Sequence, residues 1–179
     1  MLGNHPYQGG THTPDLQVFS PIHVDGRLIG YTGSIAHHID ICGRVPGTES
    51  TENTELFQEG LIFPSVKLVE AGRRVEPLFE MIAGNVRDPD ATLGDLEAQL
   101  AACRRGIERL GDLCEVYGTD TVTYAMDAHL EQTSQRARAE FSSWSQDPVT
   151  VEGFLDDDGS GFGDPVKIVV RVEVVDGVL

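Results

Sequence analysis

The sequence is poor in basic residues and in cysteine. Its 179 residues include 13 Lys and Arg against 29 Asp and Glu, which gives a formal net charge of −16. This charge argues against a sequence-independent nucleic-acid binder and against docking on an anionic membrane, because Lys and Arg supply the attraction in both cases. Three cysteines without a CxxC spacing predict neither a disulfide framework nor a cysteine-ligated metal site. A reducing compartment fits this content, and we expect a cytoplasmic protein.

Several functional motifs are also absent from the sequence. No run of about 18 apolar residues occurs, and no N-terminal segment resembles a signal peptide. The sequence contains no GxxxxGK[ST] phosphate loop, no GxGxxG fingerprint and no GxSxG nucleophile elbow. The chain therefore displays no ATP site of its own, and its motifs assign no catalytic residue.

The first part of the sequence predicts a β-hairpin. Residues 16–23 and 27–36 are rich in apolar and β-branched residues, as strands are. The pair Asp25-Gly26 between them is typical of a two-residue hairpin turn. Because the entry and exit ends of a hairpin are neighbours, we expect the segments that flank these strands to meet.

Two clusters of histidine and aspartate occupy those flanking segments. His12 and Asp15 enter the hairpin, and His37, His38 and Asp40 leave it. Two histidines and one carboxylate suit a divalent ion such as Mn, Fe or Zn, and His12, Asp15 and His37 are the predicted ligands. On a strand, His38 would point to the opposite face from His37, and Asp40 is a candidate to orient a ligand imidazole. The alternative interpretation is that these side chains are solvated or form turns.

The clearest periodicity in the sequence predicts two long helices. Apolar residues recur at alternating steps of three and four from Leu93 to Tyr117. A second helix is predicted at 120–144, and we expect the two to form an antiparallel helical hairpin. The apolar seam is interpreted as core packing or as a surface for a partner helix. A short helix is predicted at 75–86.

The C-terminal part predicts two more strands, at 149–154 and 166–175, joined by an acidic, Gly-rich turn. The run Asp156-Asp157-Asp158 lacks the downstream Glu of an EF-hand loop, so we interpret it as a solvated turn. The chain reaches an Asp-Gly turn and has no return strand after it, which indicates a segment of a larger protein.

Together these elements predict an α+β fold in a single segment, 1–179. Its expected parts are a β-hairpin-rich part that carries the metal site at 1–70, a helical part at 74–146, and a truncated β part at 149–179.

Six motifs in series carry a resemblance to a known family. They are NHPYQGGTHTPD (4–15), AHHIDICG (36–43), PGT (46–48), ELFQEGLIFPSVKL (55–68), NVRDP (85–89) and GDLEAQLAAC (94–103). In this order and spacing they resemble the hydantoinase B family, which includes B-type subunits of N-methylhydantoinase, the matching half of 5-oxoprolinase and the alpha subunit of acetone carboxylase. His5 stands where the family usually has Asp, and Cys42 stands where it usually has Gly.

The resemblance implies an ATP-dependent hydrolase that opens a cyclic amide or imide of the hydantoin, oxoproline or lactam type. It implies a hetero-oligomer in which ATP is bound by an A-type partner subunit, while the B-type subunit holds a metal beside the small-molecule substrate. The family's metal ligands carry over to His12, Asp15 and His37. Glu59 is either a polar contact near the site or a loop carboxylate.

Two other functions stay open at this point. One is an ATP-dependent carboxylase subunit of the acetone carboxylase type. The other is a non-catalytic fragment or assembly module. Because B-type subunits are several hundred residues long, we expect this segment to be inactive alone.

Overall fold

The computed structural model describes residues 1–157 and 163–178. Part of the acidic turn that follows Asp157 lies outside the described residues. Contacts divide the chain into two compact units, Met1–Val116 and Tyr117–Leu179. The three parts expected from the sequence were defined by their predicted type of secondary structure and not by contacts. That division stays a prediction.

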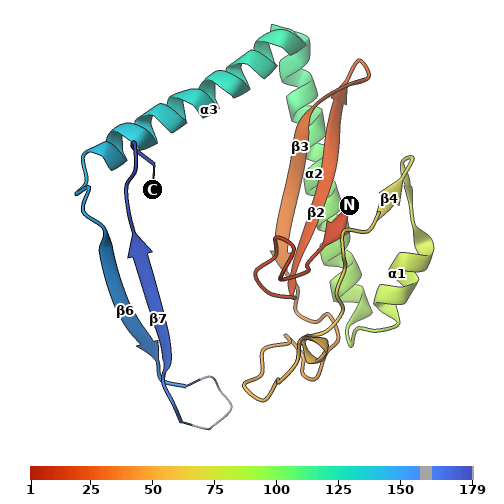
Figure 1. The fold of residues 1–179 in the computed structure, drawn as a ribbon. Helices are drawn as coiled ribbons and strands as arrows, with labels where there is room; N and C mark the ends of the chain where they lie inside the picture. The colour runs from red at the N-terminus through yellow and green to blue at the C-terminus, as the bar shows by residue number, and fades with distance from the viewer. Residues whose placement is uncertain (158–162, 179) are drawn as a thin grey trace. The chain divides into compact units, whose positions relative to one another are not determined.

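A three-stranded antiparallel sheet forms one layer of the first unit (Figure 1). Its strands, in the spatial order β1-β2-β3, are β1 (Leu2–Gly3), β2 (Asp15–Val24) and β3 (Arg27–His37). Asp25 and Gly26 join β2 to β3 with φ of 50° and 79°. Positive φ at both central residues matches the twist of a two-residue hairpin, so the predicted hairpin is confirmed.

The helices α1 (Glu76–Ala83) and α2 (Pro89–Tyr117) complete the first unit. Leu96, Leu100 and Cys103, all on the apolar seam of α2, join the buried core together with residues of β1 and β2. Gln99, on the same helix, donates from Nε2 to the carbonyl oxygens of Leu16 and Ser34 at 2.8 and 3.2 Å. The first half of the seam therefore packs against the sheet, which confirms the core-packing interpretation there.

Three short elements connect the sheet to the helices. They are a 3-10 turn, η1 (Leu56–Glu59), and the paired strands β4 (Val69–Glu70) and β5 (Arg73–Arg74). The 3-10 turn is held by the side chain of Gln58, whose Oε1 accepts the backbone N–H groups of Thr54 and Glu55. This turn lies in the ELFQEG motif and contributes Glu59 to the site described below.

The second unit consists of one helix and one hairpin. Its elements are α3 (Thr119–Ser142), β6 (Val149–Leu155) and β7 (Val166–Val172), with β6 and β7 antiparallel. The helices and strands of both units confirm the predicted α+β class, whereas the predicted packing of α3 against α2 concerns both units and stays a prediction. No helix in the described ranges is long and apolar enough to cross a membrane.

Candidate metal centre

Asp15 lies between two histidines at the open end of the β2–β3 hairpin. Its Oδ1 is 3.3 Å from Nδ1 of His37, and its Oδ2 is 3.2 Å from Nδ1 of His12. The two imidazole rings meet edge to face, with centroids 5.1 Å apart. Each residue offers a ligand atom, and these atoms lie within 4.8 Å of one another. The hairpin therefore brings His12 and Asp15 of the first cluster together with His37 of the second.

Strand register places two of these three side chains. Asp15 is the first residue of β2 and pairs directly with His37, the last residue of β3. Directly paired residues of an antiparallel sheet project from the same face. The two side chains therefore meet on the face of the hairpin opposite to the one that buries Leu16.

A tight loop brings the third side chain, His12, to this face. Asp15 N donates to the carbonyl oxygen of His12 at 3.3 Å, and Thr13 Oγ1 donates to that of Glu59 at 2.8 Å. A Cβ on Gly10 would lie 3.0 Å from the carbonyl oxygen of His5, so the loop backbone would have to shift by a few tenths of an ångström to accept a side chain there. The position of His12 is thus held by the close packing of Gly10 before it and by hydrogen bonds of Thr13 and Asp15 after it.

His38 and Asp40 point away from the group and into the interior. His38 is fully buried, with Nε2 3.0 Å from Oε1 of Gln99. Asp40 is buried too, and its carboxylate accepts Nη1 of Arg87 at 2.7 Å, the backbone N–H of Arg87 at 2.5 Å and that of Cys42 at 3.2 Å. The expectation that Asp40 orients a ligand imidazole is wrong, because its carboxylate is occupied by Arg87 and the chain.

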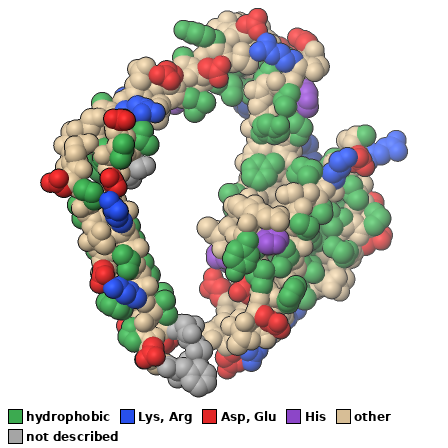
Figure 2. Space-filling view, viewed as in Figure 1, with side chains coloured by type: hydrophobic (Ala, Val, Ile, Leu, Met, Phe, Trp, Pro, Cys, Tyr) green, Lys and Arg blue, Asp and Glu red, His purple; other side chains and the backbone are tan. Residues whose placement is uncertain are grey.

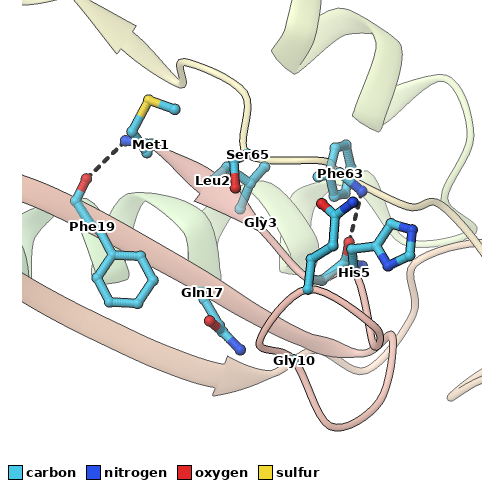
Figure 3. Close-up of a pocket in the computed structure, with 11 residues that line it drawn as sticks. Met1, Leu2, Gly3, His5, Gly10, Gln17, Phe19, Phe63 and Ser65 are labelled. Atoms are coloured by element: carbon cyan, nitrogen blue, oxygen red, sulfur yellow. Dashed lines mark hydrogen bonds between the residues drawn. The ribbon is translucent and has the colours of Figure 1, made fainter.

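The two departures from the family pattern lie at different places. Cys42 has a φ of 76°, a conformation that glycine adopts without strain. His5 lines a cavity of about 100 Å³ beside β1, together with Leu2, Phe19 and Phe63 (Figure 3). Its Nδ1 accepts the backbone N–H of Tyr7 at 3.2 Å. His5 is thus part of a separate pocket and does not belong to the group of three candidate ligands.

A second cavity, of about 200 Å³, opens beside His12. It is lined mostly by residues with polar side chains, namely His12, Pro14, Thr48, Glu49, Ser50, Asn53 and Glu59, and their carbon atoms form about half of its surface. Glu59, left open between two interpretations by the sequence, lines this cavity and is half-buried. Sequence analysis missed the contribution of 48–53, since nothing in a polar loop indicates which distant residues it will contact.

The fold and the motifs agree with the comparisons to known proteins. The chain belongs to the Hydantoinase B/oxoprolinase family, whose model matches residues 1–178. It is 33% identical, over 99% of its length, to the putative B-type subunit of a D-/L-hydantoinase from a Pseudomonas species, strain NS671, of which it covers 30%.

Two solved structures share its fold. The ATP-dependent caprolactamase from Pseudomonas jessenii superposes with a TM-score of 0.88 at 29% identity, over 96% of this chain and 30% of that chain. A nucleotide-free acetone carboxylase superposes with a TM-score of 0.86 at 18% identity, over 99% of this chain and 25% of that chain. The chain thus spans less than a third of the length of each of these relatives.

Proposed function

We propose that this chain is the metal-binding segment of a B-type subunit of an ATP-dependent hydrolase that opens a cyclic amide or imide. The convergence of His12, Asp15 and His37 carries the proposal. The description of the family as Hydantoinase B/oxoprolinase and the relatives named hydantoinase and caprolactamase support a substrate of the hydantoin, oxoproline or lactam type. ATP is bound by an A-type partner subunit in this proposal, since this sequence holds no phosphate loop.

The donor set fits Mn, Fe or Zn. His12 and His37 supply imidazole nitrogens, and Asp15 supplies a carboxylate whose negative charge offsets that of a cation. Two nitrogens and one oxygen favour borderline ions over Ca²⁺, which takes oxygen ligands. When bound, such an ion supplies Lewis acidity toward a carbonyl or a water molecule. The chain itself holds the three donors within 4.8 Å of one another, and one of them, His12, also lines the neighbouring cavity.

The lining of that cavity favours a cyclic amide over a ketone. Two of its lining residues, Glu49 and Glu59, carry carboxylates, which only accept hydrogen bonds when ionised. A lactam or imide carries an N–H that donates to such acceptors, whereas a small ketone carries no donor. A carboxylase subunit is the second candidate function, supported by the shared fold with acetone carboxylase.

Metal analysis tests the proposal first. The purified chain, reconstituted separately with Mn, Fe and Zn and then desalted, is expected to retain about one ion per chain. Retention by the parent is the expected result, and ATP-dependent hydrolysis of hydantoin, 5-oxoproline or caprolactam is expected from a full-length B-type subunit that contains this segment, assayed with an A-type subunit. A parent chain that retains none of the three ions contradicts the proposal, and the non-catalytic assembly module then becomes the leading function.

A further inference from the structure

One side chain of α2, that of Gln99, bonds to three separate segments near the open end of the β2–β3 hairpin. Its Nε2 donates to the carbonyl oxygen of Leu16 in β2 at 2.8 Å and to that of Ser34 in β3 at 3.2 Å. Its Oε1 lies 3.0 Å from Nε2 of His38, the residue that follows β3. Gln99 and His38 are both buried, with 4% and 0% of their surface exposed. Gln99 therefore joins the helix to both strands and to the chain beyond them.

These contacts determine which atoms donate and which accept. Carbonyl oxygens only accept, so the amide group of Gln99 must turn its Nε2 toward Leu16 and Ser34. Its Oε1 then faces His38, whose Nε2 carries the proton that Gln99 accepts. Nδ1 of His38 has no hydrogen-bond partner among the described residues. The bond to Gln99 is therefore what holds this buried imidazole.

A buried pair of polar side chains is suited to fixing an alignment. Figure 2 shows histidine side chains at the surface of the first unit, whereas His38 is fully buried. Two apolar side chains of similar shape would stabilise the interior about as well, because a hydrogen bond adds little net free energy. The polar pair differs in that any other arrangement of its partners leaves a buried polar atom unpaired. The bond between Gln99 and His38 therefore favours one alignment of the strands.

The hairpin turn alone does not decide which residues meet at the open end. A bulge beside Ile22 and His23 shifts the register by one residue relative to the turn. Without this shift Asp15 would face Ala36 instead of His37. A slip of one residue also turns the side chains of a strand to the opposite face of the sheet. Contacts at the open end are therefore needed to hold the register in which Asp15 and His37 meet.

We propose that Gln99 is a positioning residue of the candidate metal centre. It bonds to the residue that follows each of two candidate ligands. Leu16 follows Asp15 in β2, and His38 follows His37 at the end of β3. In an extended chain, a residue held toward the interior turns its neighbour to the opposite face. Gln99 thus keeps Asp15 and His37 side by side on that face. The inference rests on the proposed function, which assigns these two side chains to a metal ion.

Zinc affinity, measured by chelator competition on folded protein, tests this role. Gln99→Met keeps the length of the side chain but removes its hydrogen bonds, and we expect the dissociation constant for Zn²⁺ to rise about tenfold. Thr92→Val is the matched control, because it removes another buried hydrogen bond of α2, from Thr92 Oγ1 to the carbonyl oxygen of Asp40 at 3.1 Å. The control is expected to bind Zn²⁺ as the parent does. Parental affinity in Gln99→Met, or an equal loss in the control, overturns the proposal.

Two variants of His38 separate the hydrogen bond from the packing. His38→Leu removes the donor to Gln99 and is expected to weaken Zn²⁺ binding as Gln99→Met does. His38→Gln retains an N–H donor and is expected to restore most of the affinity. The visible absorption of bound Co²⁺, which depends on the arrangement of the ligands, is expected to change in His38→Leu and to match the parent in His38→Gln. Equal behaviour of the two variants contradicts a role for the hydrogen bond.

Hydrogen exchange of the metal-free chain distinguishes a failure of this inference from a failure of the proposed function. Gln99→Met is expected to speed exchange of the backbone amides at 13–18 and 34–40 about tenfold more than Thr92→Val does, and to leave those at 24–27 unchanged. Unchanged exchange at the open end overturns the inference even if the parent binds Zn²⁺. If the parent binds no ion, the proposed function fails, and the exchange result decides by itself whether Gln99 holds the open end.

Discussion

Asp15 and His37 form the first pair of the β2–β3 register, and Oδ1 of Asp15 lies 3.3 Å from Nδ1 of His37. A shift of one residue in this register would turn one of the two side chains to the opposite face of the sheet. The two-residue turn at the far end of the hairpin pairs Val24 with Arg27, and a bulge beside Ile22 and His23 then shifts the register by one residue, which brings Asp15 opposite His37. The candidate metal centre thus depends on a turn that contributes no ligand to it.

Removal of any one of the three candidate ligands is expected to lower metal affinity. His12→Ala, Asp15→Ala and His37→Ala each remove one donor, and we expect the dissociation constant for Zn²⁺ to rise about 100-fold or more. Competition with a chromogenic chelator measures it. His23→Ala is the control, because His23 is an exposed histidine of the same hairpin. An equal loss in the control, or no loss in the three variants, would contradict the assignment.

The buried carboxylate of Asp40 is expected to stabilise the fold without affecting the metal. Asp40→Ala removes the partner of Arg87 and of two backbone N–H groups, and we expect it to lower the free energy of unfolding by about 2–4 kcal/mol. Urea titration measures this loss. Zn²⁺ affinity of the folded variant is expected to match that of the parent.

An exposed ion pair supplies the comparison for Asp40. Glu52→Ala breaks the contact between Glu52 and Arg44 at the surface, and a change within about 1 kcal/mol is expected. If Asp40→Ala lowered the free energy of unfolding as little as this control does, the contact between Asp40 and Arg87 would not stabilise the fold. If instead it abolished Zn²⁺ binding while the protein stayed folded, Asp40 would belong to the metal centre after all.

Local features of the sequence were sufficient to predict the hairpin and that its two flanking clusters would be neighbours, but not the bulge beside Ile22 and His23 that places Asp15 directly opposite His37. Turn chemistry and alternation act over a few residues, so they can be read from one sequence. The partner of Asp40 was not predictable in this way, because Arg87 lies 47 residues away and no periodic pattern connects them. Contacts between residues far apart in the sequence were therefore the part of the structure that the sequence did not predict.

Helix periodicity likewise predicted a local feature but not its long-range contacts. The seam that begins at Leu93 predicted a helix with one apolar face, and α2 has it. Periodicity gives the width of such a face but not the element it contacts, and the first half of this seam contacts the sheet. Gln99, a polar residue beside the seam, bonds to the backbone of two strands, which only the packed structure reveals.

Two glycines of α2 are expected to respond in opposite ways to alanine. Gly106 lies against β3, where an added Cβ would be 2.5 Å from Oγ1 of Thr32, whereas Gly111 has open space around it. Gly111→Ala is expected to raise the free energy of unfolding by about 0.5–1 kcal/mol through helix propensity. Gly106→Ala is expected to lower it by about 1–3 kcal/mol, because the helix must move from the sheet.

Thermal or urea unfolding of both variants checks this contrast. Since the same residue type replaces the same residue type within one helix, propensity cancels in the difference between them. A stabilising Gly106→Ala would mean that α2 does not pack as closely on β3 as the structure indicates.

The buried thiol of Cys103 is expected to make stability fall at alkaline pH. Burial raises the pKa of this thiol above its ordinary value of 9.0, and contacts with the hydroxyls of Ser20 and Thr32 only partly oppose the rise. The unfolded chain therefore loses this proton at a lower pH than the folded chain does. The stabilisation is complete below pH 9 and is lost as the pH rises through the folded pKa.

Urea unfolding at pH 7, 8, 9 and 10 measures this effect. Above pH 9 the free energy of unfolding of the parent is expected to fall more steeply than that of Cys103→Ala, by up to about 1 kcal/mol per pH unit. Cys42→Ala is the control, because it retains Cys103 and is expected to keep the steeper slope of the parent. Parallel slopes for the parent and Cys103→Ala would mean that the thiol ionises as readily in the folded chain as in the unfolded one, and that solvent reaches the contact between α2 and β2.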